Sequence, residues 1–308
     1  MNNELLSTPE KMEKTKEKKF KSYKASKIAS NVLAHVILVF LSIIWIYPIL
    51  WIVLQAFRTE LNDQGELIGI VVSNYFPKRV GFDNFVTLFT NTLFLTWFKN
   101  TIIVAICSCV LSTLLTLSVA YVMSKIQFKL RKTFMNIVMI LGLFPGFMSM
   151  IAVYYILKAV NLTQSLFALV LCYSAGAGLG FFVAKGFFDI IPNSLIESAK
   201  LDGCTQSQIF AKIVLPLSKP IIIYTALLAF TGPFMDFIFA RVILGQTNTE
   251  LHTVAVGLYY MIYGNRVDSN IFTTFAAGCV CVAVPIVALF MVLQKYYVEG
   301  VTSGAVKG

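Results

Sequence analysis

The side chains that could do chemistry are few in this sequence, and cysteine is the most frequent of them. Six cysteines occur in 308 residues, and four of them form two C-x-C pairs. Thiolate pairs can bind zinc, but such sites take further thiolates or histidines nearby, and neither histidine lies beside a pair. Inside apolar blocks, cysteine acts as a small apolar residue. We therefore expect no metal, no cofactor and no disulfide framework from Cys107, Cys109, Cys172, Cys204, Cys279 and Cys281.

Asp236 and Arg241 are the charged candidates, because they interrupt a long apolar block. A charge in hydrocarbon is costly and usually faces the interior of a helix bundle or a cavity. Asp236 could pair with Arg241, contact a partner subunit, line a solute path or relay protons. We favour the ion pair or the subunit contact, since a proton-driven transporter usually has more than one such acid.

Helix-breaking residues stand near the middle of two apolar blocks. Pro145 interrupts one block, and Gly232-Pro233 interrupts another. Breaks of this kind are tolerated where neighbouring helices or a cavity satisfy the freed backbone groups. They are either simple kinks or points that gate or line a pathway, so the possible pathway residues are Pro145, Gly232, Pro233 and Asp236.

Long apolar segments must carry these residues. The chain is 57% hydrophobic and 13% charged, whereas a soluble globular chain has about 25% charged residues. Several apolar blocks reach the length of about 20 residues that a helix needs to cross the bilayer. The sequence therefore predicts an all-α, polytopic membrane protein with six transmembrane helices. The expected spans are 31–56, 101–124, 135–160, 165–185, 217–244 and 271–294.

The basic residues predict how these spans are oriented. Residues 1–30 hold eight lysines, and Lys125–Lys132 holds four positive charges and no acid. Loops rich in Lys and Arg stay in the cytoplasm, so both termini are expected there, in a multi-pass protein of the plasma (inner) membrane. The domains are then a basic arm at 1–30, a six-span domain at 31–294 and a tail at 295–308. The net charge of +10 needs no nucleic-acid partner.

The polar segment Ile191–Pro216 reads as two short helices. Ser194 is followed three residues later by Glu197, and Thr205 three residues later by Gln208. Both pairs have the spacing of a capping box, in which each side chain bonds to the backbone N–H of the other. The sequence therefore predicts a helix beginning at each pair.

A turn and an apolar stripe complete this loop, which we place at 186–216 on the cytoplasmic side. Gly203 is suited to the left-handed residue that ends a helix. The second helix puts Ile209 and Ile213 on neighbouring turns. An apolar stripe outside the membrane must be buried. It packs either on the chain's own helix ends or in the groove of a soluble partner.

The loop resembles the EAA motif of ABC importer permeases. The matching residues are Glu197-Ser198-Ala199, then Asp202-Gly203, and, after nine intervening residues, Ile213-Val214-Leu215-Pro216. The resemblance implies a type I ABC importer permease fold, in which this loop docks into a cleft of a separate ATPase subunit. Ser198 replaces the more usual alanine. The residues implied in ATPase coupling are Glu197, Ser198, Ala199, Asp202, Gly203, Ile209, Ile213, Leu215 and Pro216.

Two more segments are similar to MalG-like maltose/maltodextrin permease subunits. The ending 294–308 resembles their tail, which reaches between the ATPase subunits. Residues 253–258 resemble their last external loop, which contacts the solute-binding protein. Where that family often has Trp-Asn, this chain has Phe234-Met235-Asp236, so solute contacts are not assigned. The implied residues are Thr302, Ser303, Gly304 and Ala305 for the tail, and Thr253, Val254, Ala255, Val256 and Gly257 for the loop.

Residues and resemblance together predict the permease subunit of an ABC importer for maltose and maltodextrins. No G-x-x-x-x-G-K-[ST] loop is present. We therefore expect no catalytic residue and no enzyme activity here, with ATP hydrolysis in a partner. Expected partners are ATP-binding cassette ATPase subunits, a second homologous permease, an extracytoplasmic solute-binding protein and membrane lipid. The alternatives are import of another sugar or small solute, an ion-coupled secondary transporter, which would show internal repeats, and a membrane scaffold or receptor subunit.

Overall fold

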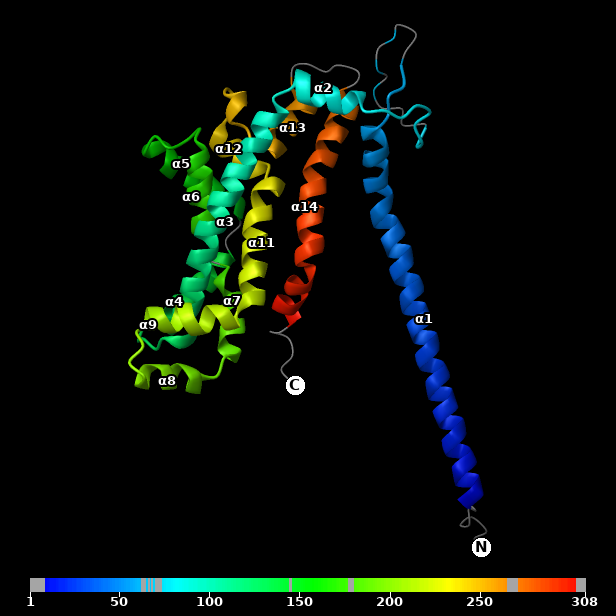
Figure 1. Ribbon diagram of the computed structural model, residues 1–308, viewed down its shortest axis with the longest axis vertical. Coiled ribbons are helices and arrows are strands. Elements are labelled where there is room, and N and C mark those ends of the chain that lie inside the picture. Colours follow the sequence, from blue (N-terminus) through cyan, green and yellow to red (C-terminus); the bar gives the residue numbers. More distant parts are fainter. Residues whose placement is uncertain are drawn as a thin grey trace. The chain divides into compact units, whose positions relative to one another are not determined.

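Helices form most of the chain in the computed structural model (Figure 1). The described part contains no β-strand beyond two isolated bridges, Arg58 with Val80 and Leu61 with Leu67. The all-α prediction is therefore confirmed. The structure describes residues 9–302 except 62–64, 66, 68, 70–73, 144–145, 177–179 and 265–270, and it describes only the backbone of 9–22, 24–26 and 297–302.

The chain divides into two compact units, Met1–Leu54 and Gln55–Gly308. The first consists of most of helix α1, Pro9–Ala56. Its part from Lys27 to Ala56 is long and apolar enough to cross a membrane. The side chains from 31 to 50 are all exposed within the chain, as a lipid-facing surface would be. The helix starts before the expected span, so the boundary between arm and membrane domain stays a prediction.

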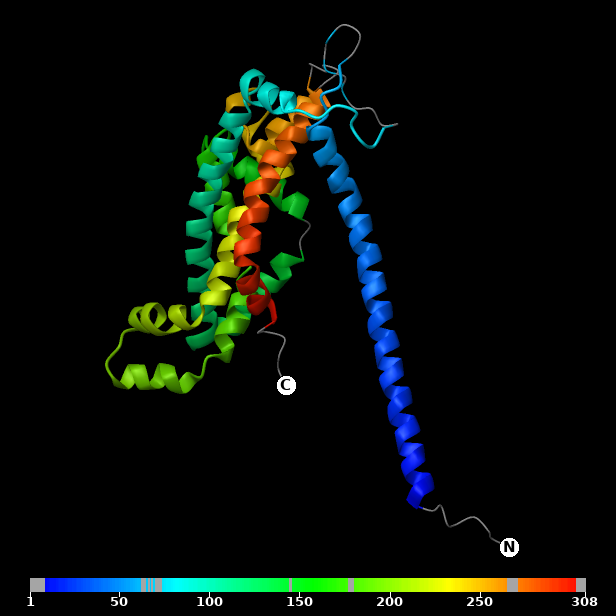
Figure 2. The ribbon, with the colours of Figure 1, turned by 45° about the vertical axis from the view of Figure 1, so that its right-hand side comes forward.

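The second unit is a bundle built around one long helix, α3 (Phe94–Lys125). It packs against α6, α7 and α11, and α11 packs in turn against α14 (Figures 1 and 2). Two short helices, α2 and α13, contact α14. The bounds are α2 Asp83–Asn91, α6 Leu166–Gly176, α7 Phe181–Ile190, α11 Lys219–Met235, α13 Val254–Tyr263 and α14 Ile271–Thr302.

In the part of the chain that the structure describes, three helices are each long and apolar enough to cross a membrane: α1, α3 and α14. Three bent pairs pass the same test of length and composition when each is taken as one broken span, which brings the total to six. These pairs are α4 (Arg131–Gly142) with α5 (Gly146–Ala159), α6 with α7, and Gln206–Leu217 with α11, which meet at 88°.

The fifth expected span, 217–244, is not one continuous helix in the structure. Helix α11 ends at Met235, and a separate helix, α12, runs from Ile238 to Leu244. Pro233 lies inside the last turn of α11. Proline has no N–H for the helical hydrogen bond, and its ring crowds the preceding turn. Pro233 therefore weakens the last turn of α11, and the helix ends where Asp236 takes an extended backbone conformation.

Candidate functional site

The segment singled out from the sequence forms a hairpin of short helices (Figure 2). We call Asn193–Leu217 the α8–α10 hairpin. Gly203 turns the chain between its two arms with a left-handed φ of +79°. The N–H of Cys204 donates to the carbonyl of Ala199, and that of Gly203 to Lys200. These two bonds form the Schellman end predicted for Gly203. The hairpin comprises α8 Asn193–Leu201, α9 Gln206–Ile209, the π-helical η2 Phe210–Val214 and α10 Leu215–Leu217.

One of the two predicted capping boxes is present. Thr205 N donates to Gln208 Oε1 over 2.8 Å, and Gln208 N donates to Thr205 Oγ1 over 3.3 Å. The box at Ser194 and Glu197 is wrong, because α8 already begins at Asn193 and has no side-chain cap. The N-cap is Pro192, with an extended backbone, so this helix begins two residues earlier than the predicted cap at Ser194 implies. Ser194 is therefore inside the helix instead of in front of it.

The apolar stripe of the second arm is buried within the chain. Ile209 and Val214 are 0% exposed, and Ile196 of the first arm is 3% exposed. They belong to one core with Phe181 and Phe188 of α7. Of the two alternatives for this stripe, the structure shows packing on the chain's own helix ends. Ile213 and Leu215 are part-buried against the same core, Ala199 is buried, and Pro216 is exposed.

The tip of the hairpin is what remains open to a partner. Leu201 is 89% exposed at the end of α8, beside the exposed Asp202 and Gly203. Glu197 and Ser198 are exposed as well. Leu201 is the most exposed apolar side chain of the hairpin, ahead of Leu217 at 53% and Leu195 at 45%. The sequence pattern did not identify it because it lies off the predicted stripe.

Helix α3 holds the base of the hairpin. Tyr121 donates a hydrogen bond of 2.8 Å to Gln206 Oε1. Lys125 Nζ donates to the carbonyl of Ile191 over 2.6 Å and to Asn193 Oδ1 over 3.1 Å. Sequence reasoning treated Lys125 only as an orientation signal. Together, Lys125 and Tyr121 connect the end of α3 to both arms of the hairpin, at Asn193 on the first arm and at Gln206 on the second.

Asp236 stabilises the break that follows α11. Its carboxylate accepts from the backbone N–H of Phe239 and Ala240, at 3.1 and 3.2 Å, and so caps α12. Its backbone N–H donates to Gly232, at the last turn of α11. The predicted ion pair does not form. Arg241 Nε instead donates to the Tyr260 hydroxyl over 3.1 Å.

Residues 113–303, more than half of the chain, match the family described as binding-protein-dependent transport system inner membrane components. The chain belongs to this family. It is thus a multi-pass membrane subunit of a transport system, as the sequence predicted.

Named relatives of this permease match it over nearly their whole length. It is 35% identical to the maltodextrin transport system permease protein MalD of Streptococcus pneumoniae, over 93% of this chain and 99% of that one. It is 33% identical to the galactooligosaccharides transport system permease protein GanQ of Bacillus subtilis, over 89% and 95%. Its fold is that of a chain in the crystal structure of a bacterial alginate importer, with a TM-score of 0.75 and 22% identity over 88% and 98%.

Four of the five residues predicted to face a binding protein are buried inside this permease. Thr253, Val254 and Val256 are at most 1% exposed, and Gly257 is buried. The exposed part of the same loop is 246–250. The prediction had taken the apolar run as loop, whereas from Val254 onward it is helix α13, which packs against α3 and α14.

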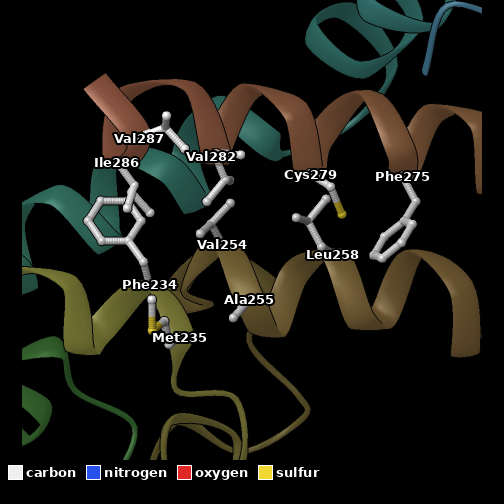
Figure 3. Close-up of a pocket in the computed structure, with 11 residues that line it drawn as sticks. Phe234, Met235, Val254, Ala255, Leu258, Phe275, Cys279, Val282, Ile286 and Val287 are labelled. Carbon is white, nitrogen blue, oxygen red and sulfur yellow. The ribbon is translucent and has the colours of Figure 1, made fainter. Parts of the chain in front are cut away.

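An apolar groove of about 440 Å³ lies between α13, the end of α11 and α14 (Figure 3). Val254, Ala255 and Leu258 line it from α13, while Cys279 and Phe275 line it from α14. These side chains are apolar, so the groove itself offers no side-chain hydrogen bond to a sugar.

Polar contacts from α3 fix the loop in front of α13. Trp97 Nε1 donates to the carbonyl of Thr249 over 2.8 Å, and Asn100 Nδ2 donates to the carbonyl of His252 over 3.0 Å. His252 is 0% exposed and stacks on Tyr260, with ring centroids 5.1 Å apart. Burial lowers the pKa of His252. The loop therefore contains a histidine that resists protonation.

The remaining predicted residues lie at or beyond the edge of the described part. Thr302 is the last residue of α14, and Ser303, Gly304 and Ala305 lie outside the described residues, as does Pro145. The six cysteines are free, and none of the described residues form a cluster suited to a metal ion.

Proposed function

We propose that this permease is the transmembrane subunit of an ATP-driven importer of oligosaccharides of the maltodextrin class. The observation that carries this proposal is its likeness to a maltodextrin permease over 93% of its own length. Import of galactooligosaccharides is the second candidate, supported by a match of 33% identity over 89% of the chain. Both solutes are neutral, so the path needs no row of charges.

The α8–α10 hairpin is the proposed docking point for a separate ATPase subunit. Its tip presents Leu201, Asp202 and Gly203 to solvent, while its base is tied to α3 through Tyr121 and Lys125. A partner bound at the tip can therefore move helices in the bundle. Glu197 and Ser198 would contact the ATPase, whereas Ala199, Ile209, Ile213 and Leu215 would support the hairpin from within.

Transport then follows as a shift between two packed arrangements of the spans. ATP binding to the partner favours one arrangement only if it binds that arrangement more tightly. The break after Gly232-Pro233, held by Asp236, lies where one span can bend. A second permease would complete the cavity, the solute-binding protein would deliver the sugar, and the tail at 302–305 would reach the ATPase. Both termini and the hairpin would lie in the cytoplasm.

Uptake by a strain that lacks only this subunit tests the solute. Labelled maltotetraose and a labelled galactotetraose are supplied separately, with and without the gene restored. The proposal expects restored uptake of maltotetraose and little of the galactose oligomer. The opposite ranking supports the second candidate, and restoration of neither contradicts both. Affinity purification of the tagged permease should also recover an ATPase subunit in stoichiometric amount.

A further inference from the structure

A cavity of about 570 Å³ lies between the loop after α3 and the first turns of α4. Three of its lining residues are cations, Lys129, Arg131 and Lys132, and no lining residue is acidic. Within the described part of the chain, none of these three side chains has an ion-pair partner. The cavity therefore gathers three positive charges that the chain itself does not neutralise.

The floor of this cavity is largely apolar. Met135, Asn136 and Met139 line it together with Lys132. Positions three, four and seven residues apart share one face of a helix, so these four side chains form a single stripe along α4. Val138 of α4 is buried in the bundle core, and Met135 is part-buried against the same core. Lys132, Asn136 and Met139 are exposed, so the stripe runs along the border between the packed side of α4 and its open side.

The cavity is at the same end of the permease as the α8–α10 hairpin. Arg131 and Gln127 also line a polar cavity of about 660 Å³, together with Glu197 and Lys200 of α8. On the same helix α4, the apolar side chains of Phe134, Ile137 and Ile140 are 44%, 49% and 58% exposed. The cationic cavity thus adjoins the hairpin at one end and lies on a helix with exposed apolar side chains.

We infer that this cavity binds an anionic phospholipid, with the phosphate headgroup on Lys129, Arg131 and Lys132 and an acyl chain along Met135 and Met139. Basic pockets at the cytoplasmic ends of membrane helices bind such headgroups. An acidic face of a soluble partner would use the cations but not the apolar floor. The bound lipid would stabilise the loop before α4, where Arg131 also lines the polar cavity next to α8. The inference does not depend on which solute is imported.

The test is the preference for phosphatidylglycerol over phosphatidylcholine. The full-length permease is purified with its partner subunits and reconstituted in nanodiscs. Displacement of spin-labelled phosphatidylglycerol by each unlabelled lipid then gives the preference. The triple variant K129Q/R131Q/K132Q should lose about tenfold or more of it. The control R79Q/K99Q/K158Q also removes one arginine and two lysines, all exposed and outside the cavity. It should keep the wild-type preference.

The inference would be overturned if both triple variants lost the phosphatidylglycerol preference equally, or if K129Q/R131Q/K132Q did not lose it. It would also be overturned if that variant kept its lipid preference but lost the ATPase subunit, because the cations would then serve the protein partner. A second test labels the wild-type complex with a photoactivatable phosphatidylglycerol, so it does not depend on the folding of any variant. It should label peptides within 127–139, and labelling elsewhere contradicts the site. Displacement of that label by millimolar inorganic phosphate would show a free-anion site instead of a lipid site.

Discussion

The hydroxyl of Tyr173 in α6 donates a hydrogen bond of 2.5 Å to the carboxylate of Asp236, at the junction of α11 and α12. The same carboxylate accepts from the backbone of Phe239 and Ala240. One side chain therefore connects α6 to the broken helix and caps its second half. A part-buried carboxylate with this many donors is stabilised without an ion pair.

Replacing Asp236 with alanine should destabilise the permease. Loss of a helix cap costs about 1 kcal/mol, and the Tyr173 hydroxyl also loses its acceptor. We expect a lower midpoint of thermal unfolding in nanodiscs and reduced uptake. Asp236→Asn keeps an acceptor oxygen and should keep most of both. A proton relay predicts instead that Asn is as inactive as Ala.

Gly203 should tolerate asparagine better than valine. Its φ is +79°, and a Cβ at this position would meet no atom within 4 Å, so backbone strain alone decides the outcome. Asparagine enters the left-handed region readily, whereas valine does not. Uptake should survive Gly203→Asn and fall severely with Gly203→Val. As a control, Gly186→Ala has equal space and no left-handed φ, so it should be neutral. Wild-type uptake by the valine variant would contradict this.

Leu201 and Ile209 should behave oppositely when truncated to alanine. Ile209 is fully buried, so its truncation should cost about 2–5 kcal/mol and lower the yield of folded protein. Leu201 is 89% exposed, so its truncation should leave thermal stability unchanged. It should nevertheless weaken ATPase recovery in affinity purification. Unchanged ATPase recovery would remove Leu201 from the docking surface.

The turn at Gly203 and the box at Thr205 and Gln208 were predictable from the sequence, because each depends on a few consecutive residues. The same spacing at Ser194 and Glu197 predicted a box that does not form, since the helix already begins after Pro192. The contacts between distant segments were not predictable. The burial of Ile209 depends on α7, and the anchoring of the loop depends on Tyr121, which is 85 residues from Gln206. A pattern within one helix cannot show which distant helix covers it.

The outer loop illustrates the same limit. Val254 and Gly257 read as a loop facing a partner, but α13 packs on Trp97, and Trp97 Nε1 bonds to a carbonyl 152 residues away. The break after Pro233 was visible in the sequence as a proline. The role of Asp236 was not, because its contact with Tyr173 joins two spans that are 63 residues apart.

Gly257 should tolerate no side chain. A Cβ there would lie 2.1 Å from the ring of Trp97, which is 6% exposed and cannot move freely. Gly257→Ala should therefore lower the free energy of unfolding by about 1–3 kcal/mol or more, because the site becomes overpacked. Gly232→Ala is the matched control, since its added Cβ meets nothing within 4 Å. Comparable melting temperatures for the two variants would contradict the close contact.

The stability of the permease should fall as the pH drops below about 6.5, the ordinary pKa of histidine. Burial lowers the pKa of His252, so the unfolded chain takes up a proton that the folded chain resists. The stabilisation is complete above that pH and is lost below it. Between pH 7.5 and 5.5, the midpoint of thermal unfolding should fall less in His252→Phe than in the wild type. The same change at the exposed His35 should keep the wild-type difference, and a loss there instead would contradict the assignment.

The corner at Ser218 makes Gln206–Leu217 and α11 the two limbs of an L, set at 88°. At 1.5 Å per helical residue the limbs are about 18 and about 25 Å long. If the L swings as one piece about its corner, the far end of α11 travels about 1.4 times as far as the end of the short limb. Geometry alone then amplifies a small sideways shift at Gln206, and delivers it next to the capped break at Asp236.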